Sequence, residues 1–309
     1  MAKSIKWGIS IPQIFPNATP DIDFIKNFIL KAEELGYHSL WVQEHIEEYQ
    51  PSMDPIGLLN FAATLTSRVK MGTSVLLPIF RNPVHLAKSL STLDIISKGR
   101  FIYGVGLGAL PEQYSSFGFK NEKRVKQFLE GLRVLKSLWV QESTSFDGEF
   151  WKLNEVSIYP KPVQSPHPPI WFGGRHPDAL KRAVLNGNGW IGAGGSSTET
   201  FVQNVKDLRI ILDKNQVDPA KFPIAKRVYI ALDNDENRAI NRLEKWFADR
   251  YKNNRAKEVC VWGSPEKCIQ GLNDVIEAGA QIIQLDPVFD QLEQVESLKN
   301  DVIDKIYVN

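Results

Sequence analysis

The feature that most constrains the fold of this chain is a regular alternation of short apolar runs with longer stretches of helical periodicity. Residues 21–35 are typical, because apolar side chains recur there at helical spacing and Gly36 follows as a C-terminal stop. The apolar runs before and after such stretches have the length of buried strands. Strict alternation of this kind predicts parallel strands joined by right-handed helical crossovers.

The number of these units favours one architecture. Eight units share 309 residues, or roughly 39 residues each, which fits a closed barrel better than an open sheet. We therefore expect an α/β protein with a (β/α)8 TIM barrel in a single domain spanning 1–309. The expected strands are 5–11, 39–42, 70–76, 101–105, 169–172, 190–191, 227–232 and 281–285, and the expected helices are 21–35, 55–65, 83–97, 122–139, 177–185, 198–212, 236–250, 265–279 and 291–306.

Residues 141–168 interrupt the rhythm of the units. They are rich in Pro, Ser and aromatic residues, and Asp147-Gly148 is a typical hairpin turn. We expect an insertion with a short hairpin here. A segment of this length could cover a binding pocket and exclude water from it.

Charge and composition exclude several partner classes. The 37 basic and 36 acidic residues give a net charge of +1, which argues against a dedicated nucleic-acid-binding protein. The apolar runs are shorter than a membrane span requires, and Met1–Lys6 leads into a strand without a signal sequence. Neither Cys260 nor Cys268 has neighbours typical of metal ligands. We expect a cytoplasmic protein with no metal site, no nucleic-acid partner and no membrane partner.

The run Gly104-Val105-Gly106-Leu107-Gly108 follows a predicted strand. Its spacing differs from the dinucleotide-binding pattern G-x-G-x-x-G, and no helix begins directly after it. The better interpretation is a barrel strand whose glycines let a flat ligand approach the backbone. A glycine-rich turn that binds nothing remains an alternative.

A second glycine pair lies in Gly173-Gly174-Arg175-His176, between a predicted strand and the helix that begins at Pro177. Free N–H groups at a helix start, together with an arginine, favour binding of an anion such as phosphate. A plain tight turn is the alternative.

Residues directly past the strands of a barrel face its active-site mouth. Glu44 and His45 follow the second predicted strand, and a histidine there is a candidate for acid–base chemistry or for a structural hydrogen bond. By the same argument Gln13, Tyr49 and Phe80 lie at the rim. Motifs of P-loop nucleotide hydrolysis, nucleophile-elbow hydrolysis and zinc proteases do not occur in the sequence.

Taken together, several stretches resemble the luciferase-like monooxygenase family, which includes bacterial luciferase and deazaflavin-dependent oxidoreductases. They occur in family order over about residues 5–286. The matching stretches are Gly36–Val42 with Glu44-His45, Gly72–Pro78, Arg81–Ala87, Leu93–Phe101, Gly104–Gly108, Pro160–Gln164, Pro168–Gly174, Ala179–Ala183 and Gly189-Trp190.

This resemblance implies a flavin-dependent oxidoreductase that acts on a small organic substrate. It would use either reduced FMN with oxygen or coenzyme F420 for hydride transfer, and the family suggests a homodimer. The ring would lie against the peptide Ser74-Val75, which is often cis in the family, and near Gly106. The phosphate would lie at Gly173, Gly174 and Arg175, and His45 would be the catalytic residue beside the reactive ring.

Three positions depart from the sugar-phosphate and alcohol dehydrogenases of the deazaflavin branch. Ala109 stands where those enzymes carry Glu, Tyr49 replaces a Trp, and Gln13 replaces a first-strand Glu of some members. Their substrates are therefore not carried over. We expect the substrate pocket to include Gln13, Glu44, Tyr49, Phe80 and Ala109. A non-catalytic flavin-binding protein, and a barrel hydrolase or isomerase of a phosphorylated substrate, are the alternatives.

Overall fold

The computed structural model describes residues 5–15, 19–45, 52–108, 114, 117 and 121–306. Two residues of the expected substrate pocket, Tyr49 and Ala109, lie outside these ranges. Within the described ranges, no helix has both the length and the apolar character needed to cross a membrane.

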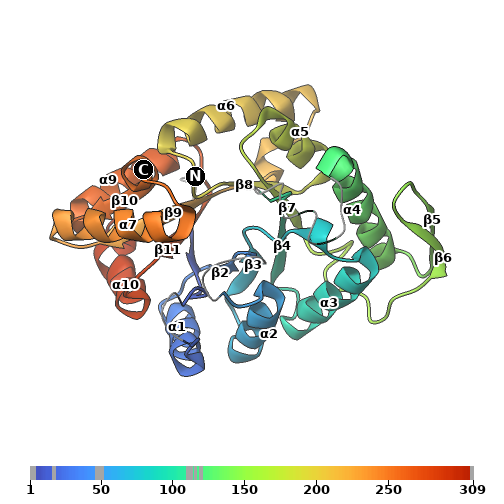
Figure 1. Cartoon of the computed structure of the whole chain (residues 1–309), viewed down its shortest axis with the longest axis horizontal. Coiled ribbons are helices and arrows are strands. Elements are labelled where there is room, and N and C mark those ends of the chain that lie inside the picture. Colours follow the sequence, from blue (N-terminus) through green and yellow to red (C-terminus); the bar gives the residue numbers. More distant parts are fainter. Residues whose placement is uncertain are drawn as a thin grey trace.

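Eight parallel strands close into a barrel, which confirms the expected (β/α)8 fold (Figure 1). The strands pair in the order β11-β1-β2-β3-β4-β7-β8-β9, and the pairing of β9 with β11 completes the ring. The barrel strands are β1 Lys6–Ser10, β2 Ser39–Val42, β3 Lys70–Thr73, β4 Phe101–Val105, β7 Ile170–Gly173, β8 Gly189–Gly192, β9 Ile224–Leu232 and β11 Ile282–Pro287.

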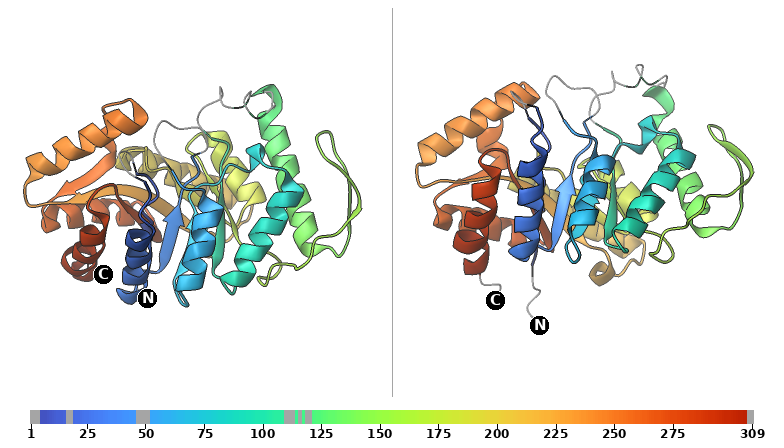
Figure 2. Two further views of the ribbon diagram at one scale, coloured as in Figure 1. Left: turned by 60° about the horizontal axis from the view of Figure 1, so that its bottom comes forward. Right: turned by 90° about the horizontal axis from the view of Figure 1, so that it is seen from below.

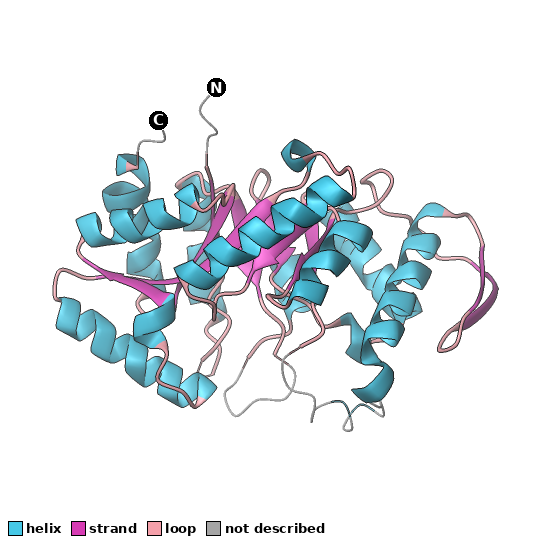
Figure 3. Ribbon diagram, turned by 90° about the horizontal axis from the view of Figure 1, so that it is seen from above, coloured by secondary structure: helices cyan, strands magenta, loops and turns pink. Residues whose placement is uncertain are grey.

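The helices surround this ring of strands (Figure 3). Their starts follow local capping chemistry, since Asp54 and Asn82 each accept a backbone N–H in front of a proline at the first turn. The helices are α1 Ile22–Glu34, α2 Pro55–Leu65, α3 Pro83–Ile96, α4 Arg124–Val140, α5 Pro177–Asn186, α6 Thr198–Lys214, α7 Glu236–Tyr251, α8 Ala256–Val259, α9 Pro265–Glu277 and α10 Gln291–Ser297.

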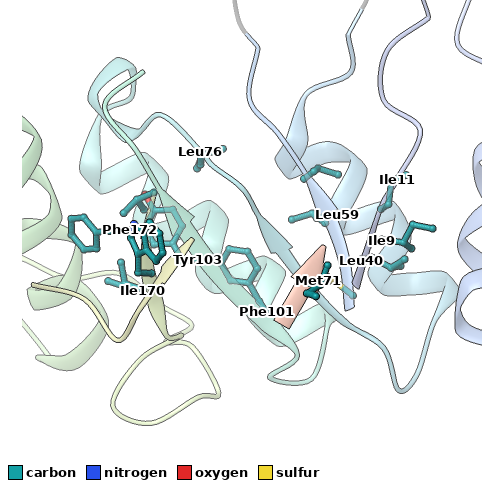
Figure 4. Packing of buried hydrophobic residues seen from close by; sticks show 14 of the residues in the cluster. Ile9, Ile11, Leu40, Leu59, Met71, Leu76, Phe101, Tyr103, Ile170 and Phe172 are labelled. Atoms are coloured by element: carbon teal, nitrogen blue, oxygen red, sulfur yellow. The ribbon is translucent and has the colours of Figure 1, made fainter. Parts of the chain in front are cut away.

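Hydrophobic side chains fill two layers on either side of the strands. On β2, Leu40 packs outward into the large cluster shared with the helices, whereas Trp41 belongs to a separate cluster with Trp171 and Ile191. Successive side chains of a strand point to opposite faces, so the second cluster fills the inside of the barrel. Figure 4 shows the outer layer, where Leu59 of α2 lies near Leu40.

The sequence did not predict β10 Cys260–Gly263, which pairs only with β9 among the described strands. The nine-residue β9 pairs with β8 and β11 through its first part, and its last four residues, Tyr229–Leu232, pair with β10. The end of β9 therefore extends past the short strand β8 and pairs there with β10 instead.

One predicted helix needs correction. The final helix does not run to residue 306, because α10 ends at Ser297 and gives way to a π turn and then a 3-10 turn. Ser264 is the N-cap of α9, but its hydroxyl donates to Glu266 rather than accepting a backbone N–H.

The insertion does form the expected hairpin, from β5 Thr144–Asp147 and β6 Lys152–Val156. The buried carboxylate of Glu130 on α4 accepts the N–H groups of residues 149–151 and so ties the hairpin turn to that helix. Figure 2 shows the hairpin on the outer side of α4. None of residues 141–168 lines the large cavity described below, so the expectation that they cover it is wrong.

Candidate cofactor site at the barrel mouth

The segment after β3 connects three barrel strands. The Ser74-Val75 peptide is cis, as the resemblance implies. Ser74 N–H donates to the carbonyl of Val42 at 2.8 Å, and Leu76 N–H donates to that of Gly104 at 2.9 Å. The cis peptide is thus held between the ends of β2 and β4.

The side chain of Val75 lies between two glycines of neighbouring strands. A Cβ atom at Gly106 would lie 2.5 Å from Val75 Cγ2, and one at Gly173 would lie 2.7 Å from Val75 Cγ1. Any larger residue at either position would displace Val75, because such contacts are far inside van der Waals distance. The two glycines therefore make room for Val75 itself, which was not foreseen from the sequence.

A cavity of about 640 Å³ opens at this end of the barrel. All six residues predicted to bind the cofactor line this cavity. Its size is that of a small-molecule or cofactor site. The lining residues on which the following argument depends are Ser74, Val75, Gly106, Gly173–His176, Gly192–Gly195, Tyr229, Tyr251 and the five arginines Arg124, Arg175, Arg182, Arg227 and Arg255.

The charge of this cavity is one-sided. Among the described residues that line it, five are arginines and none is acidic. Arg227 is paired with the buried Asp286, and Arg255 with the exposed Glu258. Burial lowers the pKa of Arg227, but Asp286 together with Tyr229 and Tyr251 outweighs this effect and raises the pKa above its usual range. The cavity suits a ligand that carries negative charge.

Ser74 provides an unsatisfied polar group in the wall. Its side chain is 9% exposed, and its Oγ atom has no hydrogen-bond partner within the described part of the chain. A buried hydroxyl without a partner is costly, and a ligand that offers a polar atom would remove this cost. Ser74 therefore fits the polar edge of a flavin or deazaflavin ring.

The loop predicted to bind an anion follows β7. Its glycine at 174 has φ +135°, and a Cβ there would lie 2.8 Å from that of Ala179. Trp190 Nε1 donates to Gly174 O, and Asn204 Nδ2 donates to Arg175 O. The C=O and N–H of one peptide unit point in opposite directions. Since these two bonds hold the carbonyls of Gly174 and Arg175, the N–H groups of Arg175 and His176 point the other way, which we take to be toward the cavity. His176 then caps α5 by accepting the N–H of Asp178.

A second glycine-rich loop between a strand and a helix, Gly192–Ser197, was not predicted from the sequence. It connects β8 to the N-terminus of α6, and four of its residues, Gly192–Gly195, line the cavity. Its signal was the composition Gly-Ala-Gly-Gly-Ser-Ser between a strand and a helix. The two glycine loops lie on adjacent strands, since β7 pairs with β8.

His45 follows β2 at the barrel mouth. The preceding residue, Glu44, donates its N–H to the carbonyl of Val75 at 3.1 Å. His45 therefore directly follows a residue that is bonded to the cis-peptide segment. His45 is half-buried, and it does not itself line the cavity.

The described residues predicted for the substrate pocket have other contacts. Glu44 is buried and bonds through its carboxylate to Leu77 N–H and to Arg81. Gln13 donates to the carbonyls of Gln43 and Met53, and Phe80 packs on Tyr114 and Phe117. None of these three lines the large cavity, although Gln13 borders a separate cavity of about 30 Å³. Their hydrogen bonds and ring contacts join the loops at the barrel mouth to one another.

A parallel barrel with a cis peptide and two glycine loops at its mouth defines a class of cofactor-binding α/β barrels. Residues 8–259 match the luciferase-like monooxygenase family, and the chain belongs to this family.

Individual relatives are redox enzymes of two kinds. The F420-dependent glucose-6-phosphate dehydrogenase of Kineococcus radiotolerans is 30% identical over 230 residues, 72% of this chain and 68% of that protein. The oxygenase component of the flavin-dependent trigonelline monooxygenase of Acinetobacter baylyi is 32% identical over 160 residues, 50% of this chain and 44% of that protein. The structure of an F420-dependent secondary alcohol dehydrogenase with an F420-acetone adduct superposes with a TM-score of 0.84, covering 98% and 99% of the two chains. At 20% identity it supports the fold alone.

Proposed function

We propose that this chain is an oxidoreductase that binds FMN or coenzyme F420 in the 640 Å³ cavity and acts on a small organic substrate beside His45. The observation that carries the proposal is the meeting of two chemistries in one cavity. The cis peptide and the partnerless Ser74 hydroxyl form one part of its wall, and two glycine loops with arginines form another. A ligand with a flat polar ring and an anionic tail would match both parts of this wall.

The residues of the chain have distinct tasks in this proposal. Val75 supports the ring, and the Ser74 hydroxyl bonds to its polar edge. The N–H groups after Gly174 and Ala193, with Arg175, hold the phosphate. His45 moves a proton to or from the substrate. When bound, the cofactor supplies the hydride or oxygen chemistry that no side chain provides.

A sugar phosphate is not proposed as the substrate. Gln13 stands where some dehydrogenases of the family carry an acid, and here its amide is used to hold the carbonyls of Gln43 and Met53. The acid–base set of those dehydrogenases is therefore incomplete in this chain.

Parallel fluorescence titrations with FMN and F420 test the proposal. We expect submicromolar to micromolar binding of one of the two, as is typical of ligands in pockets of this size. Binding of neither cofactor would overturn the proposal.

The variant His45→Ala tests the catalytic role. It should keep cofactor affinity and lose turnover by about a hundredfold or more, the usual contribution of an acid–base residue. His85→Ala, an exposed histidine on α3, is the matched control. Cofactor binding without turnover of any donor or acceptor by the wild-type protein would favour a flavin-binding protein without catalysis. Full turnover by His45→Ala would assign the proton step to another group.

The homodimer and the cytoplasmic location suggested by the sequence stay predictions. Sedimentation of the purified chain tests the first, and fractionation of cells tests the second.

A further inference from the structure

Lys226 on β9 is a buried cation at the base of the second glycine loop. Its side chain is directed away from solvent, and the residue is 2% exposed. Nζ donates to Ala193 O at 2.5 Å, to Ser196 O at 2.9 Å and to Ser196 Oγ at 3.1 Å. The three protons of an ammonium thus meet three acceptors of one loop. Lys226 does not line the cavity, but Ala193 does.

A third carbonyl of the loop, that of Gly195, is also held by cations. Arg255 Nη1 donates to Gly195 O at 3.1 Å, and Arg175 Nη1 lies 3.5 Å from the same oxygen. The carbonyls of Ala193, Gly195 and Ser196 are therefore all engaged by positive side chains. Since a carbonyl and the next N–H point in opposite directions, the hold of Lys226 on Ala193 turns Gly194 N–H away from Lys226 and toward the cavity.

We propose that Lys226 is the positioning residue of the anion site: it holds the loop 193–196 in its binding shape and, when protonated, places a positive charge behind the cofactor's phosphate. This inference rests on the proposed function, since it assumes that a phosphate-bearing cofactor occupies the cavity. A neutral side chain could fill the same space but could neither bond three acceptors nor attract the phosphate.

The surroundings make this charge sensitive to pH. Burial, followed by the nearby guanidinium of Arg227, lowers the pKa of Lys226 to about 7. The other titratable group near it is Cys260 on β10, whose own pKa is raised by burial, so its thiol is neutral at physiological pH. From α6 the ammonium meets the Phe201 ring, 5.8 Å from its centroid. A phosphate that binds in front of the loop favours the ammonium, so binding draws a proton onto Lys226.

The first experiment compares each cofactor with its phosphate-free chromophore. Riboflavin serves for FMN, and the deazaflavin alcohol without its phosphate serves for F420. In Lys226→Met we expect the affinity for the phosphate form to fall about ten- to a hundredfold, the effect of losing charge-assisted hydrogen bonds. The affinity for the phosphate-free form should change less than about threefold, because it makes no contact with the loop.

Lys136→Met is the matched control. Lys136 is a partly buried lysine on α4 that donates to Asn186 O at 2.6 Å, and it lines no part of the cavity. It should leave both affinities unchanged. Equal losses of phosphate and phosphate-free affinity in Lys226→Met would mean a merely structural role and would overturn the inference.

The second experiment needs no variant. Calorimetry of wild-type protein at pH 8, in two buffers of different ionisation enthalpy, should detect uptake of part of a proton on binding of the phosphate form and none with the phosphate-free form. FMN phosphate is fully ionised at this pH, since its second pKa is about 6. His176→Asn, which removes the histidine that lines the cavity and can keep the helix cap, should still show the uptake.

The failures of the two ideas are separable. If wild-type protein binds neither cofactor, the proposed function itself is wrong. If it binds one of them without proton uptake and without selective loss in Lys226→Met, the proposed function stands and the role of Lys226 is wrong.

Discussion

Glu44 illustrates how single residues at the barrel mouth hold the site without entering it. Its carboxylate has a side-chain exposure of 1% and joins Leu77 N–H to Arg81, which also pairs with the more exposed Asp54. Glu44→Gln leaves Arg81 without its buried partner. We expect a loss of about 3 kcal/mol in the free energy of unfolding, measured by denaturant titration, because breaking a buried ion pair is expensive.

Asp54→Asn is the control for this change. It removes the outer ion pair of the same arginine, while the amide can still cap α2 by accepting Gly57 N–H. The cost should stay below about 1 kcal/mol, as for other exposed ion pairs. Equal losses in the two variants would show that Glu44 has no special role.

Gly106 carries the second residue-scale prediction. The methyl group of Gly106→Ala would lie 2.5 Å from Val75 Cγ2, so Val75 and the cis-peptide segment must move. We expect a loss of about 1–3 kcal/mol of stability from overpacking, together with weaker cofactor binding in the same titration. Gly57→Ala on α2 is the matched control. A Cβ there would make only an ordinary van der Waals contact, 3.7 Å from Asp54 Oδ1, and alanine favours a helix, so this variant should be as stable as wild type or more stable.

At the level of single residues the sequence predicted where the site lies better than what each side chain does. The ends of strands are recognisable from local patterns, which pointed to Gly106 and Gly173, whereas Ser74 was predicted from the family resemblance. All three line the cavity. The partners of Glu44 and Gln13 lie 30 or more positions away along the chain and follow from tertiary packing. The same holds for Val75, whose fit between two glycines no local pattern encodes.

At the scale of elements, the hairpin β5–β6 is independent of the cofactor site. Its turn depends on Glu130 of α4, which accepts three consecutive N–H groups at residues 149–151. In Glu130→Ala, amide hydrogen exchange at these residues should accelerate by about tenfold or more. Cofactor affinity should not change, because the hairpin does not line the cavity.

Glu142→Ala, an exposed glutamate at the start of the same segment, serves as the control and should leave exchange unchanged. A loss of cofactor affinity in Glu130→Ala would contradict the placement of the hairpin away from the mouth.

The elements themselves were largely predictable, because each strand–helix unit carries its own periodicity and caps. The barrel strands and the bounds of α2, for example, agree with the structure within a few residues. The strand β10 was missed because four residues directly before a helix give no independent period. Its place beside β9 depends on β9 extending beyond β8, which is a property of the whole sheet.

For the whole molecule, the end of the barrel opposite the mouth sets the acid stability. His38 precedes β2, and its backbone bonds to Trp7 and Lys70. Burial, followed by Lys6 and Lys70, lowers its pKa to about 4. Between this value and the unfolded value of about 6.5, the unfolded chain binds a proton that the folded protein does not. The free energy of unfolding should therefore fall as the pH drops from about 6.5 to 4.

His38→Asn should flatten this dependence, measured by urea unfolding at several pH values. The slope attributable to His38 should stay below about 1.4 kcal/mol per pH unit, since the side chain is only partly buried. His85→Asn, at an exposed position, is the control. An identical pH profile for wild type and His38→Asn would assign the acid sensitivity to other groups.

The fit of Val75 between Gly106 and Gly173 also has a consequence for descent. A lineage that replaces either glycine loses packing at once, and a lineage that first shortens residue 75 opens a cavity between β4 and β7. The three positions are therefore expected to change together or not at all. In evolutionary terms they form one inherited character, and their identities in a related barrel should report whether it keeps the same cofactor platform.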